Sequence, residues 1–160
     1  MRILLAEDEV TIAVTLRDAL EEAGHVVMGS ADTSGAIALL ERESPELVIT
    51  DVRMPGAGGM SVLERSMALD PARPVLLMTG FGTIDQAVDA MRAGAVDYVQ
   101  KPFRNEAIVQ RVAAFARLKS LEEENRALRE RLATSEAADL VIGSSEALRR
   151  VLERVRTVAA

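Results

Sequence analysis

Short apolar runs alternate with segments of helical periodicity along the first two thirds of the chain. Five of these runs have the length and composition of strands that are covered on both faces of a parallel sheet. They are Ile3–Ala6, Val26–Met28, Leu47–Thr50, Val75–Thr79 and Val96–Val99. Because a helical pattern follows each run, the alternation predicts an α/β doubly wound sheet with right-handed crossovers.

Five helices are expected between and after these strands. In the first, apolar residues recur at helical spacing from Ile12 to Ala23, and Gly24 ends the pattern. The others are expected over about 32–42, 60–69, 83–94 and from beyond Pro102. Thr83, with Gln86 three residues later, forms a capping-box pattern at the start of the fourth helix.

The composition changes after Arg117. Residues 118–136 are rich in Leu, Glu, Arg and Ala and contain no Gly or Pro, so they are expected to continue the fifth helix. A seam with the spacing of heptad positions a and d follows Leu118, Leu121, Asn125, Leu128 and Leu132. This seam favours a parallel two-stranded coiled coil, although a single amphipathic helix lying against its own domain gives the same pattern.

The flanking charges fit the parallel arrangement. Position g of one helix faces the following position e of its partner in such a dimer. The three pairs formed in this way carry opposite charges: Arg117 with Glu122, Glu124 with Arg129, and Arg131 with Glu136. The sequence therefore predicts a homodimer through this linker helix.

Composition narrows the possible functions. The net charge of −6 argues against a broad nucleic-acid surface, and 2% aromatic residues leave little to stack on bases or flavins. There is no cysteine, which excludes disulfides and thiolate metal sites. No apolar run reaches membrane-spanning length, so the expected location is the cytoplasm.

Candidate chemistry gathers where the expected strands end. Ligands of an open parallel sheet bind beyond the carboxyl ends of its strands, so side chains at these ends are expected to converge. The second strand contributes only Gly29-Ser30 there. The other four ends carry Glu7 and Asp8, Asp51, Thr79, and Lys101.

Three carboxylates in one place repel one another unless a cation or protons intervene. Oxygen ligands without His or Cys suit Mg²⁺, which often bridges to a phosphate. Lys101 and Thr79 supply a cation and a hydrogen-bond donor for a phosphoryl group, so the set suits phosphoryl transfer to Asp51. Each residue taken alone is more typical of a turn or of a solvated charge, and only their combination favours a site.

Four stretches resemble one known family, the receiver domain of bacterial two-component response regulators. They are "ILLAEDE", "VITDVRMPGAGGM", "LLMTGFG" and "GAVDYVQKPF", in the order and at spacings compatible with that family. The resemblance covers about residues 1–118. The expected fold is a five-stranded parallel doubly wound sheet, flavodoxin-like with strand order 2-1-3-4-5, and a C-terminal helical coiled-coil extension.

The resemblance implies that Asp51 accepts a phosphoryl group from a sensor histidine kinase. It implies Mg²⁺ bound through Asp8, Asp51 and the backbone carbonyl of Arg53, with Glu7 acting through water. Such a protein is not a conventional enzyme, although it undergoes Mg²⁺-dependent self-phosphorylation and self-dephosphorylation. Two residues depart from the common pattern, because Glu7 stands where many members have Asp and Arg53 follows the acceptor by two positions.

The same resemblance assigns the remaining site residues. Thr79 and Lys101 would bind the phosphoryl group. Tyr98 would be the switch aromatic, which turns inward when Thr79 moves and alters the receiver face used for dimerisation. A cis peptide bond is implied between Lys101 and Pro102.

The tail resembles NtrC-type activators of sigma-54 transcription. In that group a segment like "LEEENRALRERL" is followed by "IGSS" and a helix, which open a AAA+ ATPase domain. This similarity divides the chain into a receiver domain at 1–118, a coiled-coil linker at 119–138 and the start of a truncated AAA+ domain at 139–160. The chain contains no G-x-x-x-x-G-K-[ST] loop and no helix-turn-helix candidate, so neither an ATP site nor direct nucleic-acid binding is expected.

These features favour a phosphorylation-controlled switch that regulates an output ATPase through dimerisation. One alternative is a dimerisation module that works without phosphorylation. Another is a phosphatase with an aspartyl nucleophile, which Arg53 disfavours because such sites need an acid at that position. A mononucleotide- or flavin-binding domain is disfavoured because "EDEVT", after the first strand, is acidic where a phosphate cradle needs glycines.

Overall fold

The computed structural model describes residues 1–80 and 84–139, and within these it leaves the side chains of 84–86 and 133–139 undescribed. The elements are β1 (Arg2–Ala6), α1 (Val10–Glu22), β2 (Val26–Ser30), α2 (Thr33–Glu43), β3 (Leu47–Asp51), α3 (Gly59–Leu69), β4 (Val75–Thr79), α4 (Ile84–Arg92), β5 (Asp97–Gln100) and α5 (Asn105–Asp139). The strands form one parallel sheet in the order β2-β1-β3-β4-β5. The predicted fold class and strand order are confirmed.

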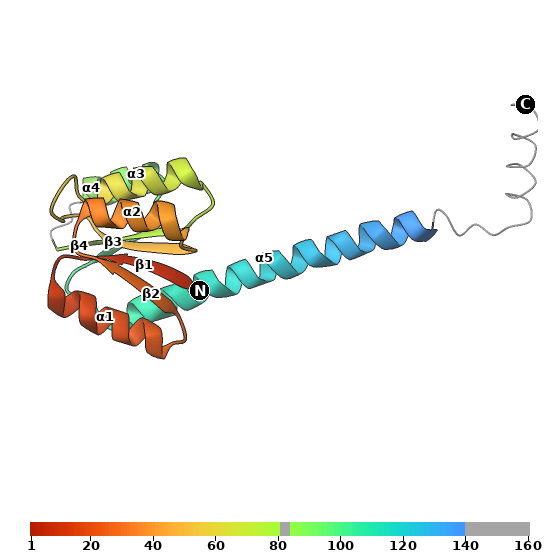
Figure 1. Cartoon of the computed structure of the whole chain (residues 1–160), viewed down its shortest axis with the longest axis horizontal. Helices are drawn as coiled ribbons and strands as arrows, with labels where there is room; N and C mark the ends of the chain where they lie inside the picture. The colour runs from red at the N-terminus through yellow and green to blue at the C-terminus, as the bar shows by residue number, and fades with distance from the viewer. Residues whose placement is uncertain (81–83, 140–160) are drawn as a thin grey trace, which may run out of the picture. The chain divides into compact units, whose positions relative to one another are not determined.

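Helices cover both faces of the sheet, with α2, α3 and α4 on one side and α1 with the start of α5 on the other (Figure 1). Alternate strand residues point to opposite faces. Leu4 and Val48 accordingly join the core under α2 and α3, whereas Leu5 and Ile49 join the core under α1 and α5. Since both faces are covered, β3 and β4 are buried along their whole length, which explains their unbroken apolar runs.

Strand ends differ slightly from those predicted. β2 continues to Ser30, two residues beyond its apolar run, because Gly29 and Ser30 pair with Leu5 and Ala6 of β1. β5 is shifted by one residue to Asp97–Gln100. Backbone pairing with the neighbouring strand determines where each strand ends. The hydrophobic pattern of the side chains does not predict this pairing. The capping-box prediction at the start of α4 involves Thr83 and the side chain of Gln86, which lie outside the described residues.

The chain divides into two compact units, residues 1–116 and 117–160. The first unit contains the sheet and its covering helices. In the second, the helix predicted after Arg117 is present to Asp139, and four of its leucines are between 50% and 63% exposed: Leu118, Leu121, Leu128 and Leu132. Residues 140–160, which carry the tail similarity, lie outside the described part. None of the described helices is long and apolar enough to span a membrane.

Candidate functional site

The carboxyl ends of β1 and β3 bring two acids together. Asp51 is the last residue of β3 and is 6% exposed, while Glu7 directly follows β1 and is 2% exposed. The two strands are hydrogen-bonded neighbours, with Ala6 paired to Thr50. This register places Glu7 and Asp51 side by side at one edge of the sheet, as the strand-end argument predicted.

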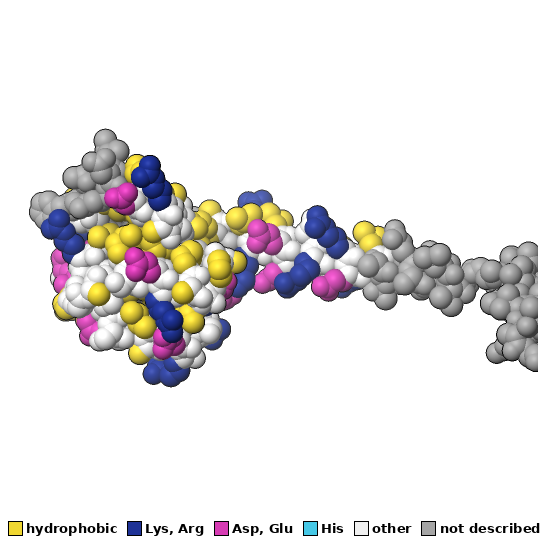
Figure 2. Space-filling view, turned by 90° about the horizontal axis from the view of Figure 1, so that it is seen from above, with side chains coloured by type: hydrophobic (Ala, Val, Ile, Leu, Met, Phe, Trp, Pro, Cys, Tyr) yellow, Lys and Arg dark blue, Asp and Glu magenta, His cyan; other side chains and the backbone are white. Residues whose placement is uncertain are grey.

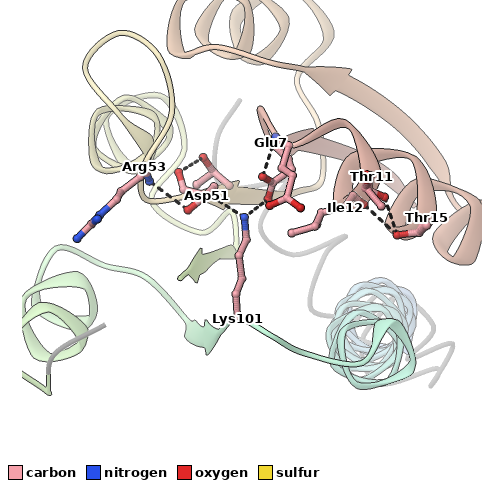
Figure 3. A network of polar contacts seen from close by, with 9 residues as sticks. Glu7, Thr11, Ile12, Thr15, Asp51, Arg53 and Lys101 are labelled. Atoms are coloured by element: carbon pink, nitrogen blue, oxygen red, sulfur yellow. Dashed lines mark hydrogen bonds and ion pairs between the residues drawn. The ribbon is translucent and has the colours of Figure 1, made fainter. Parts of the chain in front are cut away.

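Lys101 lies between these two acids. Its Nζ donates a hydrogen bond of 2.6 Å to Asp51 Oδ2 and lies 2.6 Å from Glu7 Oε2 as an ion pair (Figure 3). Oε2 of Glu7 is buried, and the ammonium of Lys101 is its counter-charge. One ammonium group therefore counters two buried carboxylates.

Backbone amides hold the other oxygen of each acid. The N–H of Glu9 donates to Glu7 Oε1 over 3.1 Å. The N–H of Arg53 donates to Asp51 Oδ1, also over 3.1 Å. Figure 3 shows the Arg53 side chain pointing away from the carboxylates, so in this arrangement Arg53 contributes to the pocket through its backbone. Each acid thus presents one fixed oxygen and one oxygen that faces Lys101.

Burial and charge shift the protonation equilibria of this pocket in two ways. Burial raises the pKa of Glu7, and the lysine and the Glu9 amide offset that rise only in part. Burial alone would lower the pKa of Lys101, but its contacts with Asp51 and Glu7 outweigh this effect and raise it. Lys101 is consequently charged at neutral pH. Burial makes the charged form of Glu7 less favourable in the folded protein than in water.

The pocket has the donors of a hard-cation site. One carboxylate oxygen each from Glu7, Asp8 and Asp51 lie within 4.8 Å of one another, with Asp8 exposed and the other two buried. Donors that are all oxygen atoms fit Mg²⁺. The acidic cluster expected from the sequence is present.

The glycines after Asp51 let α3 begin against the backbone of Asp51. Gly58 caps the helix with φ +78°, a conformation that favours glycine. A Cβ on Gly59 would lie 2.0 Å from the carbonyl oxygen of Asp51, so this position admits no side chain without a shift. The close approach of the Asp51 carbonyl therefore requires glycine at position 59.

Thr79 and Tyr98 occupy different surroundings. Thr79 is 1% exposed at the end of β4, and its carbonyl accepts the N–H of Lys101 over 2.6 Å. Tyr98 is half-buried and packs against the core that includes Leu77, with its hydroxyl lacking a partner among the described residues. Thr79 therefore lies at the site edge, while Tyr98 lies in the core beside it. The peptide bond before Pro102 is cis, as predicted.

Thr33, at the start of α2, was missed by the strand-end argument. Its side chain is almost completely buried, and its Oγ1 bonds to both Pro55 and Gly58 in the loop that follows Asp51. The available signal was the cluster of capping residues Ser30, Asp32 and Thr33 at the carboxyl end of a strand. That end was set aside because it carries no reactive group.

Comparisons with known proteins agree with this geometry. The family model described as response regulator receiver domain matches residues 3–113. The response regulator protein FleR of Pseudomonas aeruginosa is 38% identical over 94% of this chain and 35% of its own length. The C4-dicarboxylate transport transcriptional regulatory protein DctD of the same organism is 36% identical over 99% of this chain and 35% of its own length.

A solved structure extends the likeness to nearly the whole chain. A crystal structure of NtrX from Brucella abortus has a TM-score of 0.72 and 28% identity, and the match covers 99% of this chain and 34% of that one. The chain thus spans about a third of the length of the relatives it matches. The match over residues 3–113, together with relatives more than 30% identical, shows that this chain belongs to the response regulator receiver family.

Proposed function

We propose that this chain is the phosphorylation-controlled input portion of a longer NtrC-type sigma-54 activator, in which Asp51 accepts a phosphoryl group from a sensor histidine kinase. The observation that carries the proposal is the Lys101 ammonium at 2.6 Å from both Asp51 and Glu7, inside a cluster of three carboxylates. A cation held next to an acid at the open edge of a sheet is placed to receive a phosphoryl oxygen.

The transfer follows from these groups. An oxygen of Asp51 attacks phosphorus, forming a P–O bond while the P–N bond to the kinase histidine breaks and its electron pair stays on the imidazole nitrogen. Lys101 and the hydroxyl of Thr79 stabilise the charge on the phosphoryl oxygens. In self-dephosphorylation, water attacks phosphorus and the bond to Asp51 breaks, releasing inorganic phosphate. Self-phosphorylation by a small donor uses the same attack by Asp51.

Mg²⁺ fits the donor set of the pocket. Asp8, Asp51 and the backbone carbonyl of Arg53 would hold it directly, and Glu7 would act through water. The ion would supply positive charge that offsets the repulsion between the carboxylates and an incoming phosphoryl group. The raised pKa of Glu7 supports this assignment, because it marks a carboxylate whose charge the protein alone does not fully compensate.

Phosphorylation is read out through a change in dimerisation. Thr79 and Tyr98 would act together as the switch, moving the receiver face when the phosphoryl group engages Thr79. Since only two pre-existing arrangements need to be rebalanced, a bias of about 1–3 kcal/mol is sufficient. The cytoplasm, where a kinase and the transcription machinery are accessible, is the location that this function requires.

The second unit is proposed to pair with a second copy of the same chain. Its leucines are exposed, and Figure 2 shows side chains of both charges alternating with hydrophobic ones along this stretch. In a parallel coiled coil, Arg117 would face Glu122 and Glu124 would face Arg129 of the partner. We assign residues 1–118 to the receiver, 119–138 to the linker and 139–160 to the start of a AAA+ output domain.

The test is intact-mass measurement after incubation with acetyl phosphate and Mg²⁺. The native chain is expected to gain the mass of one phosphoryl group, and the Asp51→Asn variant to gain none. Repeating the incubation on ice captures a short-lived product. If neither chain gains mass under either condition, the acceptor role is wrong and the exposed leucines identify the chain as a dimerisation module that works without phosphorylation.

A further inference from the structure

The turn between β2 and α2 contacts both acid-bearing segments of the pocket. On one side, the carbonyl of Ser30 accepts the N–H of Glu7 over 2.9 Å. On the other side, Thr33 bonds to the loop 52–58, which follows Asp51. The end of β2 and the start of α2 carry no reactive group. They nevertheless hydrogen-bond to the backbone of both segments that supply ligands to the proposed metal site.

Thr33 holds the loop after Asp51 at two points. Its Oγ1 accepts the N–H of Gly58 over 2.9 Å and donates to the carbonyl of Pro55 over 3.1 Å. Its own N–H donates to the same carbonyl over 3.1 Å. Thr33 is 4% exposed, and its bond to Gly58 is buried, so no solvent replaces that bond if the hydroxyl is removed.

Thr33 is itself fixed by the cap of α2. Oδ1 of Asp32 accepts the N–H of Gly35 over 2.7 Å, which anchors the first turn of the helix. The loop that Thr33 grips contains Gly56 and Gly58, both with positive φ. Glycines allow many backbone conformations, so such a loop keeps one of them only where outside contacts hold it.

The proposed ligands of Mg²⁺ depend on this loop to different degrees. Asp51 is the last residue of β3, so the sheet positions its carboxylate directly. The carbonyl of Arg53 lies within the loop, so its position depends on the loop conformation. Mg²⁺ demands near-ideal octahedral geometry, and a ligand on an unfixed loop weakens binding.

We propose that Thr33 is a positioning residue of the Mg²⁺ site, which through its hydroxyl fixes the loop that carries the Arg53 carbonyl. This inference rests on the proposed function and adds to it a residue outside the acid cluster. The hydroxyl acts by holding two backbone groups of the loop and never contacts the metal. A hydrogen-bonding residue is therefore required at position 33, and an isosteric apolar residue fails there.

Calorimetric titration with Mg²⁺ tests this role in the Thr33→Val and Thr33→Ser variants. Valine keeps the shape and removes both side-chain bonds, so the Mg²⁺ dissociation constant is expected to rise about tenfold, as for other outer contacts of metal ligands. Serine keeps the hydroxyl and is expected to restore near-native affinity. At saturating Mg²⁺, the rate of phosphorylation by acetyl phosphate is expected to return to the native value in both variants.

Leu40→Val is the matched control, because Leu40 lies on the buried core face of the same helix, seven residues after Thr33, and makes none of the hydrogen bonds to the loop described above. It is expected to lower the melting temperature and to leave Mg²⁺ affinity unchanged. Equal affinity in the native chain and Thr33→Val, or equal weakening by Leu40→Val, overturns the positioning role. If the native chain binds Mg²⁺ and Thr33→Val binds it equally well, only this inference is wrong. If the native chain does not bind Mg²⁺, the proposed function is wrong as well.

A measurement on the native chain covers the case in which Thr33→Val does not fold. The amide signal of Gly58 in NMR is expected to shift during Mg²⁺ titration with the midpoint found by calorimetry, because its hydrogen bond belongs to the loop being fixed. If the Gly58 signal stays constant while Mg²⁺ binds, the loop is not coupled to the metal and the inference is overturned.

Discussion

The acid pocket and the helical stretch 118–132 each contain groups in an unfavourable environment, but they compensate for them differently. In the pocket, Glu7 and Asp51 are 2% and 6% exposed and share Lys101 of the same chain as their counter-ion. Along the helix, leucines at heptad spacing are between 50% and 63% exposed, and their charged neighbours follow a pattern that matches a second helix. In the pocket, a lysine of the same chain neutralises the buried carboxylates. Along the helix, the leucines remain exposed to solvent.

This difference separates what one chain can stabilise from what needs a partner. A buried carboxylate without a cation is strongly unfavourable, so the pocket had to bring its lysine from elsewhere in the same fold. An exposed row of leucines costs less and is tolerated in a monomer, but it gains stability only when another apolar surface covers it. Substitutions in the two regions should therefore affect different properties.

The largest effect is expected when the leucine seam is broken. Leu121→Lys combined with Leu128→Lys places charges at the centre of the proposed interface and removes its apolar contacts. The dimer dissociation constant is expected to rise by at least about a thousandfold, because each lost leucine costs about 2 kcal/mol or more. Sedimentation equilibrium measures this change, and thermal unfolding of the receiver is expected to stay native.

The control for the seam places two new lysines on the outer face of the helix. Ser120→Lys with Ala127→Lys, both at heptad position c, adds the same net charge as the seam pair and is expected to keep the dimer. Sedimentation of the native chain as a monomer contradicts the coiled coil at the outset. If both lysine pairs weaken association equally, charge and not the seam governs pairing.

The next effect in size is expected in the receiver, at Gly59. A Cβ there would lie 2.0 Å from the carbonyl of Asp51, so Gly59→Ala is expected to lower the free energy of unfolding by about 3 kcal/mol. Gly80→Ala is the matched control, because none of the described residues places an atom within 4 Å of a Cβ at that position. Urea unfolding of both variants measures the free energies. Equal losses in the two variants would show that the contact with the Asp51 carbonyl does not require glycine at position 59.

These two regions also show how far the sequence predicts the molecule. The buried strands β3 and β4 read as unbroken apolar runs because helices cover both faces of the sheet, and that pattern predicted the fold. The meeting of Glu7 with Asp51 followed from the rule that parallel strands end at one edge. The seam leucines were recognisable because a heptad repeat is a local pattern.

Contacts between loops were not predictable in the same way. The bonds from Thr33 to Pro55 and Gly58 join segments that no periodicity links, and the extension of β2 to Ser30 depends on backbone pairing with β1. The close approach of Gly59 to the Asp51 carbonyl likewise follows only from the fold. Local patterns therefore predicted which side chains meet, and tertiary contacts decided what holds them.

A smaller effect is expected at Glu7. It distinguishes compensation of the Glu7 charge by Lys101 from compensation by Mg²⁺. Because burial raises its pKa, charged Glu7 lowers stability, and Glu7→Gln is expected to unfold at a higher temperature than the native chain at pH 7 without Mg²⁺. A raised acid pKa means that this penalty is complete above the folded-state pKa. It disappears as the pH falls to the ordinary carboxyl value of 4.5, so the advantage of the variant should vanish on acidification.

Mg²⁺ provides the contrast for Glu7→Gln. The ion stabilises only the folded state that binds it, so the native chain is expected to gain more in melting temperature from Mg²⁺ than the glutamine variant gains. Melting curves at pH 7 and pH 4.5, with and without Mg²⁺, give both comparisons. A glutamine variant that melts lower than the native chain without Mg²⁺ would mean that the Lys101 contact outweighs the burial of Glu7.

The smallest effect is expected at Asp32, whose carboxylate caps α2. Its bonds from the Gly35 amide and the Ser34 hydroxyl lower its pKa, so the stability that its charge adds is complete above the ordinary value of 3.8 and is lost as the pH falls through the lowered pKa. Asp32→Asn keeps a capping oxygen and lacks this pH dependence, whereas Asp32→Ala loses the cap. Melting at pH 7 should therefore rank the native chain above Asn and Asn above Ala, with the gap between native and Asn closing in acid. Dimerisation should stay native in both variants, since a cap in the receiver and a seam in the linker stabilise different equilibria.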